Sequence, residues 1–179
     1  MPPTPIFILP GYDDSGPEHW QSHWERADFA CRRVVQDDWL MPRLDAWLAT
    51  LERHIALCVA PPVLVAHSLA CALVAHWAAR PGSAARAALL VAPADVDSPL
   101  RTPEEVRSFS PIPLVRLPFP SIVVTSTDDP FASLERATAF ATAWDSRVVT
   151  LERAGHINAD AGFGPWPEGR RLLAQLVAG

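Results

Sequence analysis

Apolar residues along the chain alternate between short continuous runs and repeats at helical spacing. The runs predict six strands, of which the second is the weakest: residues 5–9, 32–36, 62–66, 87–92, 121–125 and 147–151. The repeats predict helices that begin at residues 17, 44, 69, 134 and 168. Strands that alternate with helices form right-handed crossovers and a parallel sheet covered on both faces. We therefore expect an α/β fold with about six, mainly parallel strands.

Several predicted helices begin at residues that suit a helix start. Pro17 fits a first helical position, Ser133 is a candidate N-cap, and Thr102 with Glu105 forms a candidate capping box. That last helix is short and lies in residues 94–120, a proline-rich segment that interrupts the alternation. No internal repeat or long linker divides the chain, so residues 1–179 are expected to form a single domain.

One stretch joins a predicted strand to a predicted helix without a loop. Residues 62–66 are apolar, and apolar residues then recur at helical spacing from Leu69 until Pro81. Ser68 lies on the tight turn between them, where its hydroxyl would stand near the positive end of the helix. This arrangement predicts a nucleophile elbow, although alanines occupy the flanking positions that usually hold glycine. The alternative is a buried turn in which the serine has no chemical role.

Polar residues also follow two later strands at their carboxyl ends, where open α/β sheets place their sites. Asp128 and Asp129 follow the fifth predicted strand, and His156 follows the sixth. With Ser68 they give the order Ser, Asp, His, which the α/β-hydrolase topology uses. In such a triad the imidazole takes the serine proton and the carboxylate orients the imidazole. The sequence therefore predicts a triad of Ser68, one of the two aspartates and His156.

Each of these signals has a simpler explanation when taken alone. Asp-Asp-Pro is a common turn sequence, and glycine followed by histidine often forms a turn as well. His67 is a competing base, but a neighbour on the same turn is expected to point away from the serine side chain. The other histidines lie on predicted helices and are expected in packing or surface positions: His19, His23, His54 and His76. The conjunction of three signals in order favours the triad.

An acyl-transfer site also needs backbone donors for the oxyanion. The Leu69 N–H is one expected donor, because it follows Ser68 on the elbow. The Tyr12 N–H is the second, because it lies in the turn after the first strand, which is expected to neighbour the third.

Composition narrows the possible functions. The net charge is −5 and the chain contains no lysine, which excludes Schiff-base, P-loop lysine and lysine general-base chemistry. No block of arginines with interleaved aromatic residues predicts nucleic-acid binding. No glycine-rich dinucleotide motif follows the first strand, which argues against a flavodoxin-like or dinucleotide-binding domain.

The cysteines, the first residues and the long apolar stretch indicate the cellular compartment of the protein. Three cysteines, Cys31, Cys58 and Cys71, are odd in number and lack metal-site spacing, which favours a reducing environment. The first residues lack the features of a signal peptide, and the long apolar stretch of residues 62–79 contains polar side chains that suit a core better than a membrane span. We expect a cytoplasmic protein without a metal or organic cofactor.

Seven blocks distributed over nearly the whole chain resemble a known family. They are residues 9–12, 19–24, 66–70, 117–121, 127–131, 155–158 and 162–169. Together they resemble the small single-domain serine hydrolases related to retinoblastoma-binding protein nine and YdeN. The last block is the most specific, because nothing in general hydrolase chemistry requires it. The resemblance implies an α/β-hydrolase fold without a separate cap domain, and it assigns the acid of the triad to Asp129, with Asp128 as the alternative.

We therefore expect a serine hydrolase that cleaves a small-molecule ester, or an amide, through an acyl-enzyme, without a nucleic-acid or membrane partner. The proline-rich segment is expected to border the acyl pocket, which has three aromatic candidate lining residues: Phe109, Phe119 and Trp166. The rival hypothesis is a protein-interaction module that keeps the fold without turnover. Under that hypothesis the partner is a protein.

Overall fold

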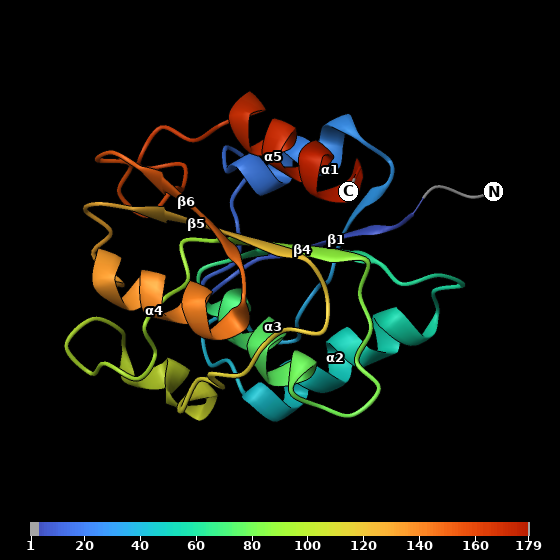
Figure 1. The fold of residues 1–179 in the computed structure, drawn as a ribbon, viewed down its shortest axis with the longest axis horizontal. Coiled ribbons are helices and arrows are strands. Elements are labelled where there is room, and N and C mark those ends of the chain that lie inside the picture. Colours follow the sequence, from blue (N-terminus) through green and yellow to red (C-terminus); the bar gives the residue numbers. More distant parts are fainter. Residues whose placement is uncertain (1–3, 179) are drawn as a thin grey trace.

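Six parallel strands form one sheet at the centre of the computed structural model, which describes residues 4–178 (Figure 1). The strands are β1 (Ile6–Leu9), β2 (Cys31–Arg33), β3 (Val63–His67), β4 (Ala87–Val91), β5 (Ser121–Ser126) and β6 (Arg147–Leu151). Their order across the sheet is β2-β1-β3-β4-β5-β6, and every neighbouring pair is parallel. The predicted α/β fold is confirmed, with a sheet that is entirely parallel.

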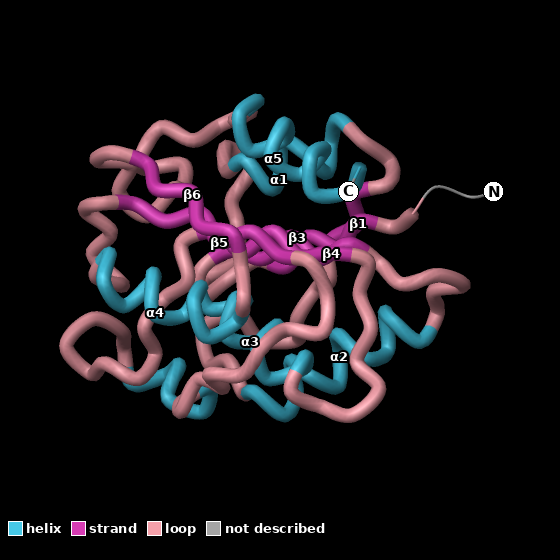
Figure 2. The backbone as a smooth tube through the Cα atoms, in the orientation of Figure 1, coloured by secondary structure: helices cyan, strands magenta, loops and turns pink. Residues whose placement is uncertain are grey.

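Helices cover both faces of this sheet (Figure 2). On one face lie α1 (Trp20–Ala27) and α5 (Pro167–Ala178), and on the other lie α2 (Leu44–Ala56), α3 (Leu69–Ala78) and α4 (Leu134–Trp144). The short 3-10 helix η1 (Glu104–Phe109) packs against α3. Within the described residues, no helix has both the length and the apolar character needed to cross a lipid bilayer.

Side chains alternate between the two faces along each strand and so build two core clusters. In β1, Phe7 and Leu9 belong to the cluster that includes α2 and α3, whereas Ile8 packs with Trp20 of α1. Every residue of β3 and β4 is buried. Burial on both faces explains why these strands appear in the sequence as continuous apolar runs.

The winding direction of the chain changes between β1 and β3. From β1 the chain proceeds to β2 on one side, and from β3 it proceeds to β4, β5 and β6 on the other. Such a switch point is where open α/β sheets place their sites. The register pairs Leu9 with Ala66, so Gly11 and Ser68, each two residues further along, emerge next to each other at the carboxyl edge of the sheet.

Residues 92–120, between β4 and β5, contain η1 and no cap domain. Arg136 of α4 fixes the start of this segment, with ion pairs of 3.1 Å to Asp95 and 2.5 Å to Asp97. Arg107 of η1 donates to the carbonyl oxygens of Val96 and Ser98. The segment therefore forms a fixed rim beside the carboxyl edge of the sheet.

The predicted helix starts are partly confirmed. Ser133 caps α4, because its hydroxyl accepts the Arg136 N–H at 3.1 Å. The helix expected from Pro17 begins instead at Trp20, after a turn, with His19 as its N-cap. The capping box at Thr102 is also wrong: the Thr102 hydroxyl donates to the Asp95 and Ser98 carbonyls and does not cap η1.

The block of residues 162–169 contains a glycine with a specific packing role. A Cβ added to Gly169 would lie 2.3 Å from a ring carbon of Trp166, and that indole stacks on Trp24 with its centroid 5.9 Å away. We expect Gly169→Ala to lower the free energy of unfolding by about 1–3 kcal/mol, because the indole must shift within a close-packed core. Urea unfolding followed by tryptophan fluorescence measures this loss.

Gly164→Ala is the matched control in the same block, since its added Cβ would meet no atom closer than 3.6 Å. Equal losses for the two variants would contradict this role of Gly169.

Candidate active site

Ser68 alone makes the turn between β3 and α3. Its backbone has φ 57° and ψ −121°, a conformation that costs a non-glycine residue about 1–3 kcal/mol. Two hydrogen bonds hold it there: the Ser68 N–H donates to the Val91 carbonyl at 2.9 Å, and the Ser68 carbonyl accepts the Cys71 N–H at 3.0 Å. The flanking alanines, Ala66 and Ala70, are fully buried. The strained turn therefore forms with alanine where glycine was expected.

The end of β1 approaches this turn closely. A Cβ added to Gly11 would lie 2.9 Å from both the His67 carbonyl oxygen and the Ser68 Cβ. Glycine supplies the clearance that the turn needs. The next residue, Tyr12, lines the same cavity as Ser68 and Leu69. Among the described residues, no acceptor is bonded to the backbone N–H of Tyr12 or of Leu69.

His156 lies on the loop after β6, between Ser68 and Asp129. Its Nδ1 lies 2.9 and 3.0 Å from the two carboxylate oxygens of Asp129, and its Nε2 lies 2.8 Å from the Ser68 hydroxyl oxygen. A carboxylate only accepts, so Nδ1 carries the proton and the unprotonated Nε2 accepts the Ser68 O–H. The structure thus brings together Ser68, His156 and Asp129 in the order predicted for a triad.

The side chains of Asp129 and His156 are shielded from water. They are 1% and 9% exposed, respectively. The imidazole of His156 packs between the rings of Phe131 and His67, with centroid distances of 4.5 and 4.8 Å. Asp129 also accepts the Phe131 N–H at 2.9 Å. Packing on both sides of the ring fixes its orientation, and the dry surroundings strengthen its bond to the carboxylate.

Asp128, the alternative acid, is exposed. None of its hydrogen bonds within the described residues involves the imidazole of His156. Its carboxylate accepts the Ser126 hydroxyl at 2.7 Å and the Gly155 N–H at 2.8 Å. The Ser126 hydroxyl, together with this N–H, holds the pKa of Asp128 below its usual value. Asp128 therefore ties the loop after β5 to the loop that carries His156.

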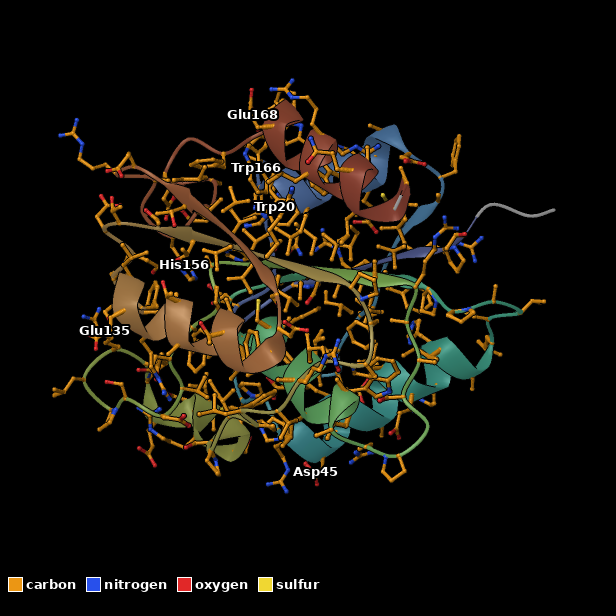
Figure 3. All side chains as sticks on the ribbon, viewed as in Figure 1. Trp20, Asp45, Glu135, His156, Trp166 and Glu168 are labelled. Carbon is orange, nitrogen blue, oxygen red and sulfur yellow. The ribbon has the colours of Figure 1, made fainter. Side chains whose placement is uncertain are left out.

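Aromatic residues from α1 hold the other end of the His156 loop. The indole N–H of Trp20 donates to the Ile157 carbonyl at 2.9 Å, and that of Trp24 donates to the Pro165 carbonyl at 2.9 Å. His67 adds a third bond at 2.9 Å, from its Nε2 to the His156 carbonyl. Figure 3 shows Trp20 and Trp166 between the sheet and the α1–α5 layer, with His156 at the edge of the sheet. These hydrogen bonds fix the position of the His156 loop relative to the sheet.

A cavity of about 440 Å³ opens beside Ser68 and His156. The three aromatic residues expected to line it lie elsewhere, so that expectation is corrected. Phe109 packs edge-on against Trp47, and Phe119 stacks on Trp77. Trp166 belongs to the opposite core cluster, with Trp20 and Trp24. Large apolar rings were needed to fill the core, and Phe131 is the aromatic residue that lines the cavity together with Tyr12 and the histidines.

Within the described part of the chain, no group of three or more His, Cys, Asp or Glu side chains is arranged to hold a metal ion. The groups around the cavity include a hydroxyl, an imidazole and two backbone N–H groups without an acceptor, which are groups that acyl transfer can use.

A model of the serine hydrolase family matches residues 6–175. The chain belongs to the serine hydrolase family. A solved structure described as a YdeN-like hydrolase from Pectobacterium atrosepticum is 36% identical, with 98% of this chain and 91% of that chain covered and a TM-score of 0.86. The expected resemblance to small YdeN-type serine hydrolases is confirmed. No curated protein sequence matches the chain.

More distant structures share the fold. The ydeN gene product from B. subtilis is 21% identical, with 99% of this chain and 100% of that chain covered and a TM-score of 0.84. Est1E from Butyrivibrio proteoclasticus is 14% identical, with 98% and 89% covered and a TM-score of 0.70. The protein is thus a serine hydrolase with the α/β-hydrolase fold.

Two histidines of this hydrolase were assigned no role at the site from the sequence, yet both line the cavity: His19 and His67. Their rings lie 4.7 Å apart, and His67 in turn contacts His156. Burial is the main cause that lowers the pKa of His19, to about 3, and burial also holds the pKa of His67 well below its usual value. Because Pro17 favours an earlier helix start, His19 was expected inside the helix, and no signal in the sequence marks it as the cap of α1.

These pKa values make the stability of the fold sensitive to acid. The unfolded chain protonates His19 near the ordinary histidine pKa of about 6.5, whereas the folded chain keeps it neutral down to about pH 3. The unfolded state therefore binds more protons, and stability falls as pH drops through this window. Between pH 7 and pH 5 the wild type should lose about 2 kcal/mol more than His19→Asn, which lacks the titrating group.

Urea unfolding of both proteins at pH 5, 7 and 8 measures the difference. The two proteins should show nearly the same change between pH 7 and pH 8, where most rings are neutral in both states. If the free energy of unfolding falls equally in both proteins below pH 7, that result would contradict the buried, neutral state of His19.

Proposed function

We propose that this serine hydrolase cleaves small carboxylic esters by a Ser-His-Asp acyl-enzyme mechanism. Ser68 is the nucleophile, His156 the general base and Asp129 the residue that orients the base. Small amides are the second substrate class. The observation that supports this most is the continuous chain of hydrogen bonds, 2.8 Å from Ser68 to His156 and 2.9 Å from His156 to Asp129.

The first half of the reaction acylates the enzyme. As the Ser68 oxygen attacks the acyl carbon, its proton passes to His156 Nε2, and the imidazolium is stabilised by the buried Asp129 carboxylate. The negative charge on the former carbonyl oxygen is stabilised by the N–H groups of Leu69 and Tyr12. His156 then returns the proton to the oxygen of the leaving alcohol as the bond between that oxygen and the acyl carbon breaks.

The second half releases the acid. Water takes the place of the alcohol, His156 accepts one of its protons, and the hydroxide attacks the acyl carbon of the Ser68 ester. Collapse of the second tetrahedral intermediate breaks the bond to Ser68, whose oxygen regains a proton from His156. The 440 Å³ cavity suits a small substrate.

A fluorophosphonate probe tests this assignment directly. The wild type should be labelled at Ser68, because the probe reacts with a serine that a neighbouring base activates. Ser68→Ala should lose the label, and Ser83→Ala, in the loop between α3 and β4, should keep it. An interaction module without turnover predicts an unlabelled wild type, and that result or equal labelling of Ser68→Ala would refute the proposal.

The two aspartates provide a second test. Asp129→Asn should lower kcat for p-nitrophenyl esters by about 10³–10⁴-fold, because an amide can donate to Nδ1 and so favours the wrong tautomer of His156. Asp128→Asn should cost about 10-fold or less, since its remaining carbonyl oxygen can still accept the Gly155 N–H. The opposite ranking in steady-state kinetics would transfer the role of the acid to Asp128.

A further inference from the structure

The residue that follows His156 has an unusual backbone conformation. Ile157 has a φ of 49°, in the left-handed region, where a β-branched residue is a rare exception because its Cβ crowds the backbone. Gly155, on the other side of His156, has a φ of 53°, and glycine adopts this conformation without such a cost. His156 therefore lies between two left-handed residues, of which Ile157 is the strained one.

The side chain and the N–H of Ile157 are both held by their surroundings. Ile157 is fully buried and belongs to the core cluster that contains Trp20. Its N–H donates to the Ala154 carbonyl at 3.1 Å, which closes the turn that carries His156. A strained conformation persists only where the surrounding structure maintains it. The bonds to the peptide groups beside Ile157 therefore decide whether this turn keeps its shape.

Aromatic side chains hold the two peptide groups that flank the Ile157 Cα. The His67 Nε2 bonds to the His156 carbonyl, and the Trp20 indole N–H donates to the Ile157 carbonyl, each at 2.9 Å. The φ and ψ of Ile157 are the rotations that relate these two planar groups. The two bonds therefore oppose relaxation of Ile157 to an ordinary conformation.

The core fixes the direction in which the Trp20 N–H points. Trp20 is fully buried, and the rings of Trp24 and Trp166 contact it edge-on, with centroid distances of 4.7 and 5.2 Å. Relaxation of Ile157 would rotate the peptide group that follows His156. That rotation would move the imidazole away from the Ser68 hydroxyl, which lies 2.8 Å from Nε2.

We propose that Trp20 is a positioning residue whose indole N–H maintains the strained conformation of Ile157 and thereby directs His156 at Ser68. This inference rests on the proposed function and adds a residue that acts through the base, from a helix on the other side of the loop.

Two tryptophans of α1 offer a matched pair of variants. Trp20→Phe and Trp24→Phe each remove one indole N–H and the same volume from the same core cluster. The Trp24 N–H donates to the Pro165 carbonyl, further along the chain, whereas the Trp20 N–H donates to the residue next to His156. A role in packing alone would affect the activity of both variants alike.

The measurements are kcat and KM for p-nitrophenyl acetate and the rate of fluorophosphonate labelling, which needs no turnover. The end point of labelling counts the active sites, and kcat is expressed per active site so that unfolded protein does not contribute. Trp20→Phe should lower kcat and the labelling rate by about 10- to 100-fold and leave KM within about 2-fold, because a displaced base slows the chemical step and not substrate binding. Trp24→Phe should lower kcat by about 2-fold or less.

A variant of Ile157 tests the strain itself. Ile157→Gly removes the Cβ that makes the left-handed conformation costly, so the turn should depend less on the indole bond. Measured against Ile157→Gly alone, the added Trp20→Phe change should lower kcat by about 3-fold or less. The same loss as in the wild-type background would overturn the role of strain.

A volume-preserving variant answers the question if Trp20→Phe does not fold. Site-specific Trp20→β-(3-benzothienyl)alanine keeps the size of the indole and removes its N–H, and the expected results are the same.

Fluorophosphonate labelling of the wild type distinguishes failure of this inference from failure of the proposed function. With a labelled wild type, an unchanged kcat and labelling rate per active site in Trp20→Phe, or equal losses in Trp20→Phe and Trp24→Phe, would overturn the positioning role alone. An unlabelled wild type would remove the proposed function and this inference together.

Discussion

The geometry of the site depends on how closely the end of β1 approaches the turn at Ser68. Parallel pairing of β1 with β3 fixes that approach, and only a residue without a side chain fits at Gly11. The same approach brings Gly11, the residue before Tyr12, close to the Leu69 nitrogen, which would lie 3.2 Å from a Cβ added to Gly11. The unfavourable backbone of Ser68 is then maintained by hydrogen bonds to β4 and to the first turn of α3. The register of β1 with β3 therefore determines both the turn at Ser68 and the position of the backbone N–H groups beside it.

The loop that carries His156 needs separate support, because it follows β6, a strand at the edge of the sheet. Bonds from three directions supply it. Asp128 holds the start of the loop through Gly155, His67 holds His156 itself, and Trp20 holds Ile157. Trp20 and Trp24 of α1 thus help to hold the loop that carries His156.

Much of this arrangement could be predicted because strand ends in a parallel sheet meet at one edge. Ser68, Asp129 and His156 follow three strands that are plain in the sequence, so topology alone brings them near each other. Packing choices were harder to predict. The aromatic residues Phe109, Phe119 and Trp166 were demanded by the core, and nothing local distinguishes them from Phe131. His19 was misplaced because Pro17 suits a helix start, whereas the turn before Trp20 lets an imidazole serve as the cap.

The hydrogen bond between Ser68 and His156 joins residues that are 88 positions apart in the chain. Contacts of such long range require the loop-closure entropy of the intervening segments to be overcome first. The Ser68 hydroxyl can reach His156 only after β4, β5 and β6 have been added to the sheet in register. The contact between this hydroxyl and the imidazole therefore depends on completion of the sheet.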